Sequence, residues 1–290
     1  MKSLKKMNFA GIMLLAFLFV ISCDKNESTD PVDDQFAQDE TFETADLQAS
    51  DESEMISEEI LSIGEDVYAA DEILSTSKGS YHSDFLPDCV TITTVITSTT
   101  KEKTIDFGDG CELPNGNVLS GIIYLSYAKD MELAEKTLSM SLENFTFNGV
   151  SVEGGASVVR MRSNENGNPQ ADATAEFSAE WPDGSNASFT ANRTREWVEG
   201  YGTGFWGDNV FLISGKGTFV GPAGNTFVKE VIEPLRRELA CRFLVSGVLE
   251  ISRNELTASL DFGDGSCDAV GILTYPNGES EEIFLRRFFN

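Results

Sequence analysis

Two short acidic segments, each close to a cysteine, are the first candidates for chemistry in this sequence. Residues 106–110 read DFGDG and precede Cys111; residues 261–265 repeat the same letters two positions before Cys267. Carboxylates at this close spacing suit calcium. The candidate ligands are Asp106, Asp109, Asp261 and Asp264. Two carboxylates per loop are few for an ion that takes about six to eight oxygens, and neither loop has the distal glutamate of an EF-hand.

The residues around each motif favour a structural interpretation. Each motif ends the return strand of an expected hairpin, with two-residue turns at Thr99–Thr100 and Arg253–Asn254. These turns pair apolar residues on one face but leave the second cysteine one residue too far to oppose the first. A β-bulge adds one residue to a strand, and glycine tolerates the backbone that some bulges require. We therefore predict a bulge in each motif, although three-residue turns would remove the need for it.

The cysteine count indicates an oxidising compartment. The chain has five cysteines, and Cys23 belongs to a separate N-terminal pattern, which leaves an even number. Four cysteines in an exported chain allow three disulfide connectivities. Spacing favours Cys89–Cys111 and Cys241–Cys267.

The N-terminus predicts export. Lys2, Lys5 and Lys6 precede an apolar run at positions 9–21, which is too short to span a bilayer comfortably. The run ends in Val20-Ile21-Ser22-Cys23, which resembles the lipobox of bacterial lipoproteins. We expect a signal peptide over residues 1–22 and a lipid on Cys23 as the membrane anchor. The alternative is an uncleaved anchor helix.

An aromatic and glycine-rich segment, residues 197–209, is the candidate for ligand binding. Its candidate contact residues are Trp197, Tyr201, Phe205, Trp206, Asp208 and Asn209. Exposed rings of this kind stack on sugars or grip a protein strand, and the polar pair would supply hydrogen bonds. The alternative is a β-rich core with aromatic strand ends.

Catalytic patterns are weak. His82 is the single histidine, it lies in a polar segment, and no Gly-x-Ser-x-Gly motif accompanies it. A histidine-based zinc site is excluded by count, and no carboxylate pair is singled out for glycoside hydrolysis. We expect no catalysis and no cofactor, with calcium as the one open possibility.

Periodicity divides the chain into a helix and a β region. Ile56, Ile60, Ile63 and Val67 lie on one apolar stripe, which continues to Ala70 and Leu74 and predicts an amphipathic helix over residues 50–77, capped by Ser50 or Ser53. Alternating strands separated by glycine turns fill residues 89–290. No βαβ alternation occurs. The expected fold is all-β: an antiparallel meander forming a curved sheet, sandwich or open barrel, with the helix packed on it.

Charge defines the remaining parts. The chain has 48 acidic and 21 basic residues, for a net charge of −27, so nucleic acid and anionic lipid surfaces are poor partners. Residues 23–49 are acidic and lack periodicity, which predicts a disordered tether. The expected parts are therefore a signal peptide (1–22), a tether (23–49), a helix and loop (50–88) and an all-β domain (89–290). The arginines at 193, 195, 236 and 237 are expected to pair with carboxylates at the surface.

Two resemblances bear on these expectations. DFGDG resembles the signature of PKD domains, which are extracellular β-sandwich modules, but Ile105 and Leu260 replace the usual preceding tryptophan. The two DFGDG–cysteine hairpins, the run Arg193–Gly200 and the lipobox together resemble a group of uncharacterised Bacteroidota lipoproteins. This second resemblance implies export, lipidation and an all-β fold, and it supplies no activity. The start Cys23-Asp24-Lys25-Asn26-Glu27 resembles that of surface-exposed members of this phylum's lipoproteins.

The sequence therefore predicts a lipid-anchored outer-membrane protein, exposed at the cell surface, with a binding or structural role; the alternative location is the periplasmic face. Its expected partners are the membrane, through lipid on Cys23, and a glycan or a surface protein. One alternative is a periplasmic open-barrel carrier of a lipid or other apolar ligand, which predicts a cavity beneath the helix. An exported hydrolase ranks lowest.

Overall fold

The computed structural model describes residue 42, residues 44–76, residue 81 and residues 83–285. The predicted signal peptide, Cys23, the tether up to residue 41 and His82 lie outside this set. Within the described residues, no helix combines the length and the apolar character needed to cross a bilayer.

The predicted helix is present and longer than expected. Helix α1 (Thr44–Thr76) begins six residues before the predicted start, so Ser50 and Ser53 lie inside it and the predicted cap is wrong. Ser53 Oγ instead donates to the carbonyl oxygen of Ala49 at 2.7 Å. The predicted stripe packs into the core at Ile56 and Ile60, whereas Leu74 near the end is exposed.

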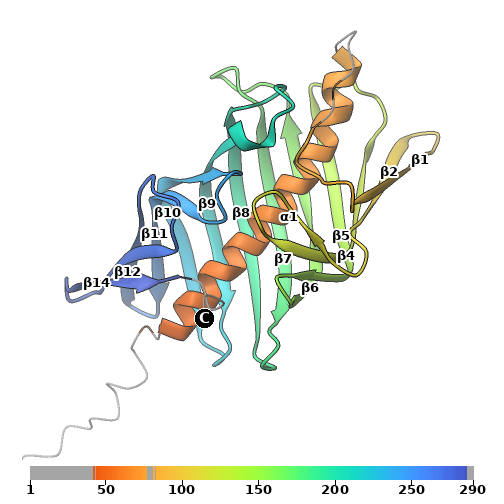
Figure 1. Ribbon diagram of the computed structural model, residues 1–290. Helices are drawn as coiled ribbons and strands as arrows, with labels where there is room; N and C mark the ends of the chain where they lie inside the picture. Colours follow the sequence, from red (N-terminus) through yellow and green to blue (C-terminus); the bar gives the residue numbers. More distant parts are fainter. Residues whose placement is uncertain (1–41, 43, 77–80, 82, 286–290) are drawn as a thin grey trace, which may run out of the picture. The chain divides into compact units, whose positions relative to one another are not determined.

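The rest of the described chain is one antiparallel sheet, which confirms the all-β fold with a single helix. Its strands are β1 (Thr91–Ile96), β2 (Thr100–Asp106), β3 (Cys111–Glu112), β4 (Val118–Ala128), β5 (Glu135–Phe147), β6 (Val150–Met161), β7 (Gln170–Glu180), β8 (Asn186–Glu199), β9 (Val210–Val220), β10 (Thr226–Glu238), β11 (Leu244–Arg253), β12 (Leu256–Asp264), β13 (Val270–Thr274) and β14 (Ser280–Phe284). Strands pair in sequence order, except that β2 and β3 both pair with β4. The described sheet is open, with β1 and β14 at its two edges. It curves, and α1 crosses its concave face (Figure 1).

Strand alternation builds the concave face. On β7, residues 171, 173, 175, 177 and 179 are buried, and the residues between them are exposed. Four of these five buried residues are alanines, and Phe177 is the fifth. Small side chains let the helix backbone approach, and β7 is the strand that α1 approaches most closely. The opposite, convex face of β7 is polar because the intervening positions carry carboxylates and hydroxyls.

Glycines in the strands permit the curvature. Gly154 has φ +123°, and a Cβ at this position would lie 2.2 Å from the carbonyl oxygen of Glu176 on β7. Gly215 on β9 has φ +115° and approaches the carbonyl oxygen of Asn192 equally closely. No other residue type fits such positions without displacing the neighbouring strand. Bends of this kind let a sheet wrap around an element on its concave side.

Helix α1 is buried on all sides through most of its length. From Asp46 to Ala69, every residue except Gln48 is buried. The sheet covers one side, and two covering loops, residues 113–117 and 239–243, approach the helix where Asn115 and Arg237 donate to Glu59. The position of a Cβ on Gly116 lies 3.6 Å from Cδ of Arg242, so these loops meet. Both ends of the sheet thus close over the helix.

Candidate functional site

The first DFGDG motif lies where the chain passes from one strand to the next. Ile92 pairs with Ile105 rather than with Phe107, so the predicted register is wrong by two residues. The turn is one residue earlier than predicted, with Thr97 N donating to the carbonyl oxygen of Thr100. The motif separates β2 from β3, and both strands pair with β4. It is therefore an insertion relative to β4 rather than a bulge relative to β1.

The second motif contains the predicted bulge. Ser246 pairs with Asp264 and Val248 with Asp261, so two residues of β12 face a single residue of β11. The extra residue lies at Phe262–Gly263, as predicted. The register is again wrong by two residues, since Ile251 pairs with Ala258 and the turn lies at Asn254–Glu255. Asn254 has φ 55°, which asparagine adopts more readily than most residues.

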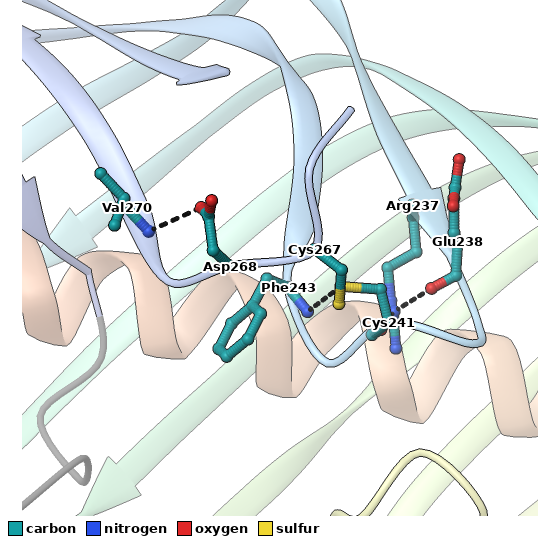
Figure 2. Close-up of a disulfide and its surroundings, with 7 residues drawn as sticks. All are labelled: Arg237, Glu238, Cys241, Phe243, Cys267, Asp268 and Val270. Atoms are coloured by element: carbon teal, nitrogen blue, oxygen red, sulfur yellow. Dashed lines mark hydrogen bonds between the residues drawn. A yellow bond between two sulfur atoms is a disulfide. The ribbon is translucent and has the colours of Figure 1, made fainter. Parts of the chain in front are cut away.

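Both predicted disulfides are present. Cys89 and Cys111 are joined with a Cα–Cα distance of 5.8 Å, and Cys241 and Cys267 with 5.7 Å. The other two connectivities are thereby excluded. Figure 2 shows the second disulfide next to Arg237 at the end of β10. An Nη1 hydrogen of this arginine is donated to the carbonyl oxygen of Cys241.

Three of the four aspartates in the two motifs accept hydrogen bonds from residues of their own turn. Asp106 Oδ1 accepts from Gly108 N, and Asp261 Oδ1 accepts from Gly263 N, both at 2.8 Å. Asp264 Oδ1 accepts from Ser266 Oγ at 3.0 Å, and Asp109 is exposed. In the part of the chain described here, no group of three or more His, Cys, Asp or Glu side chains is placed to hold a metal ion.

The aromatic segment divides between core and surface. Trp197 is 2% exposed and packs against Tyr201 and Phe211, with ring centroids 5.1 Å and 4.9 Å away. The Tyr201 hydroxyl donates to Glu72 Oε2 of α1 at 2.8 Å. These residues fasten the helix to the sheet.

The other candidates of this segment lie in the turn that contains a short 3-10 helix, η1 (Trp206–Asp208). Trp206 packs on Phe85, and Phe205 is 55% exposed. Asp208 is half-buried and accepts from Thr203 Oγ1 at 3.0 Å, while Asn209 is buried. The structure does not bring the six candidates together on one exposed surface.

The main assembly of charged groups lies between α1 and the concave face, and the sequence did not predict it. Buried cations from β6, β8 and β10 meet buried carboxylates of the helix. The pairs are Arg160–Glu72, Arg193–Glu54, Arg195–Glu58, Arg195–Glu65, Lys229–Glu54 and Arg237–Glu59. The expected pairing of the arginines with carboxylates is confirmed, but their surface location is wrong for Arg193, Arg195 and Arg237. Arg236 is the one that is partly exposed, where it pairs with Glu199 and Glu238.

Glu54 accepts hydrogen bonds from two buried cations. Arg193 donates to both of its oxygens at 2.9 Å, and Lys229 Nζ donates to Oε2 at 2.7 Å. Burial opposes ionisation of this carboxyl, but the two cations outweigh burial and hold its pKa well below its usual range. Glu54 therefore remains charged in the folded protein throughout the neutral range.

Glu59 joins the helix to both covering loops. Asn115 Nδ2, from the first loop, donates to Glu59 Oε1 at 2.9 Å. Arg237 Nη2, next to the second loop, donates to Oε2 at 2.7 Å. One carboxylate thus connects the two disulfide-bearing ends of the sheet.

A signal for the charged interior exists in the sequence. The buried face of β8 runs Ala187, Phe189, Ala191, Arg193, Arg195, Trp197 at every second position. Cations that continue an apolar face with period two indicate buried partners, because an unpaired buried charge is strongly unfavourable. The partners of these two arginines are three carboxylates of α1, those of Glu54, Glu58 and Glu65.

The convex face has its own depression. A hollow of about 510 Å³ lies over β6, β7 and β8. Its polar lining residues are Glu153, Glu176, Ser178, Ser188 and Thr190. Gly154 and Gly155 form part of the floor, so backbone groups are accessible between the side chains.

No family model, no curated protein and no solved structure matches this chain.

Proposed function

We propose that this chain is an exported lipoprotein, anchored through lipid on Cys23, whose β domain has a binding or structural role at the outer membrane. The domain acts on the cell surface, without catalysis or a cofactor, and its partner is a glycan or another surface protein. The lipobox supports the anchor. The two disulfides support an oxidising compartment.

The observation that carries the proposal is the occupied concave face. A sheet that curves around its own helix, and holds it by buried ion pairs, presents its convex face and its edges to partners. The convex hollow over β6–β8 offers hydroxyls and carboxylates, which suit a polar partner. Phe205, in the turn after β8, adds an exposed ring.

The same observation counts against the carrier alternative. A carrier needs space beneath the helix, whereas the core residues of α1 pack there against the sheet. To admit an apolar ligand, α1 would have to leave and expose paired charges on both surfaces. A delipidated preparation that bound a fatty-acid probe would restore this alternative.

The anchor is tested by replacing its cysteine. We expect the full chain to fractionate with membranes and to incorporate labelled palmitate, and Cys23→Ser to abolish both. Membrane association of Cys23→Ser equal to that of the parent chain would contradict the anchor.

The location is tested by protease treatment of intact cells. Cleavage of the lipidated protein on intact cells, with a periplasmic protein protected, supports surface exposure. Protection until lysis would contradict it and place the domain on the periplasmic side.

The binding role is tested with a glycan array, comparing the parent chain with Glu153→Lys/Glu176→Lys, which alters the convex hollow without touching the core.

A further inference from the structure

A cleft opens beside the C-terminal half of α1, away from the convex hollow. Its volume is about 370 Å³. The apolar walls come from the helix, the following loop and β1, and include Val67, Leu86 and Ile92. Its polar lining includes Asp66, Ser83 and Lys103. The cleft therefore combines apolar walls with a few polar groups, as do sites for small molecules.

Asp66 is the buried charged group of this cleft. It is 4% exposed, and Ser83 Oγ donates to its Oδ1 at 2.8 Å. Among the described residues, no cation lies within ion-pair distance of it. Lys103, on the same cleft, donates to Asp71 at 3.1 Å, and Lys101 donates to Asp71 as well. Both lysines of β2 are thus paired with Asp71, five residues further along α1.

The surroundings of Asp66 are poorly suited to a negative charge. Burial raises the pKa of Asp66 to about 7, the hydrogen bond from Ser83 opposes this effect, and the charge of Asp84 adds to it. Tyr81 also lines the cleft, and burial together with Asp66, Asp208 and Asp84 raises the pKa of its hydroxyl to about 12. Tyr81 therefore stays neutral. A cation entering from outside would supply the kind of partner that Glu54, Glu58 and Glu59 receive from the sheet.

We propose that this cleft binds a small molecule that carries a protonated amine on an apolar stem, with Asp66 as its counter-ion. The ammonium group donates to Asp66 and to the hydroxyl oxygens of Ser83 and Tyr81. The stem lies along Val67, Leu86 and Ile92. An anionic ligand would meet the charges of Asp66 and Asp84, and a purely apolar one would leave Asp66 without a cation. The site is independent of the proposed anchor and of the convex hollow.

The proposal predicts charge-selective binding that depends on pH. The probe is hexylamine, added to the full-length chain with its disulfides intact, and binding is followed by NMR and calorimetry. The alkylammonium stays protonated at about pH 8 and about pH 5.5, whereas Asp66 is ionised mainly at the higher value. We expect saturable binding at the higher pH, weaker by about tenfold at the lower one. Hexanol and hexanoate are expected not to saturate.

Three variants separate the site from general effects. Asp66→Asn keeps the shape and an acceptor for Ser83, and it should weaken hexylamine binding at least about tenfold. Leu86→Trp narrows the cleft without altering charge, and it should weaken binding to a similar degree. Asp88→Asn is the matched control, because Asp88 is exposed at the rim of the same cleft. It removes the same charge and should change affinity by less than about twofold.

Each outcome decides for or against the site. Amine-selective binding that is lost in Asp66→Asn and Leu86→Trp but kept in Asp88→Asn supports it. Absence of saturable amine binding overturns it, as does equal affinity in Asp66→Asn or equal binding of hexanol. Thermal unfolding of each variant confirms that the folded chain is being compared.

Discussion

Arg195 contacts one face of α1 through every part of its guanidinium group. It pairs with Glu58, donates from Nε to Glu65 Oε1 at 2.8 Å and from Nη2 to Ser62 Oγ at 2.9 Å. Cζ of the same guanidinium group lies over the ring of Phe211, 4.7 Å from the ring centroid. Burial, together with the charge of Arg237, lowers the pKa of Arg195 to about 9. The group remains a cation at neutral pH.

Removal of this cation should destabilise the protein strongly. Arg195→Met leaves Glu58 and Glu65 buried without their partner, so we expect the free energy of unfolding to fall by about 3–5 kcal/mol. Chemical denaturation monitored by circular dichroism measures this change. Arg195→Met/Glu58→Gln/Glu65→Gln removes all three charges and should recover a large part of the loss. A triple variant less stable than the single one would contradict the assignment.

Asp66 and Asp71 should affect the pH dependence of stability in opposite directions. The pKa of Asp66 is raised to about 7 by burial, so the folded state binds its proton more tightly than the unfolded state. Its contribution to stability is therefore present at acidic pH and is lost between about pH 4 and 7. Asp66→Asn removes this decline and should stabilise the protein by about 2–4 kcal/mol at neutral to alkaline pH.

Asp71 provides the matched comparison. Burial opposes its ionisation, but Tyr127, Lys101 and Lys103 outweigh burial and lower its pKa. Its contribution is present above its unfolded pKa and is lost as the pH falls through the lower folded value. Asp71→Asn should therefore destabilise the protein at neutral pH. Denaturant titrations at several pH values measure both effects, and destabilisation by Asp66→Asn at alkaline pH would contradict the account of that residue.

At the scale of elements, the sequence predicted α1 through its apolar stripe but did not predict that its other faces are buried as well. Ile56 and Ile60 lie where the stripe predicts, whereas Glu54 and Glu58 on other faces are equally buried. The reason is physical: acidic positions in a helix ordinarily face water, and here they face cations supplied by strands more than a hundred residues away. No local pattern in the helix contains that information. The one signal for the buried charges is that Arg193 and Arg195 continue the apolar face of β8 at every second position.

Hairpin registers show a second limit. The disulfide partners and one bulge followed from the spacing of cysteines and glycines, whereas both turns were misplaced by one residue. Residues 97–100 are Thr-Ser-Thr-Thr, which give no distinct signal for the turn centre. Asn254 did give one, because asparagine favours the left-handed conformation that it adopts there. The candidate aromatic platform failed to form for a related reason, since Trp197 continues the buried face of β8.

Gly154 should be essential for the curvature of the sheet. Gly154→Ala places a Cβ 2.2 Å from the carbonyl oxygen of Glu176 in a backbone conformation unfavourable for alanine. We expect a loss of about 2 kcal/mol or more in the free energy of unfolding, measured by thermal and chemical denaturation. Gly110→Ala is the control, because its Cβ meets no atom within 4 Å and its φ is not in the left-handed range. Equal effects of the two substitutions would contradict the steric argument.

At the scale of the whole molecule, the disulfides and Glu59 act together to keep the sheet closed over α1. The two disulfides close loops with sequence separations of 22 and 26 residues. Reduction should therefore lower the free energy of unfolding by about 2–4 kcal/mol for each bond. Hydrogen exchange should also increase in α1 near Glu59 before it increases in β7. Unchanged exchange of the helix in the reduced protein would contradict the role of the covering loops.

The position of α1 in the chain has a consequence for the order of folding. Glu59 is separated from Arg237 by 178 residues, and Glu54 from Lys229 by 175. A ribosome completes the helix long before it adds these cations, and Arg193 also follows Glu54 by 139 residues. During synthesis Glu54 and Glu59 therefore remain without these cations until the later strands are made, and their charges keep this part of the helix hydrated. The native structure becomes available only when almost the whole polypeptide is present, so folding of the domain follows its synthesis rather than accompanying it.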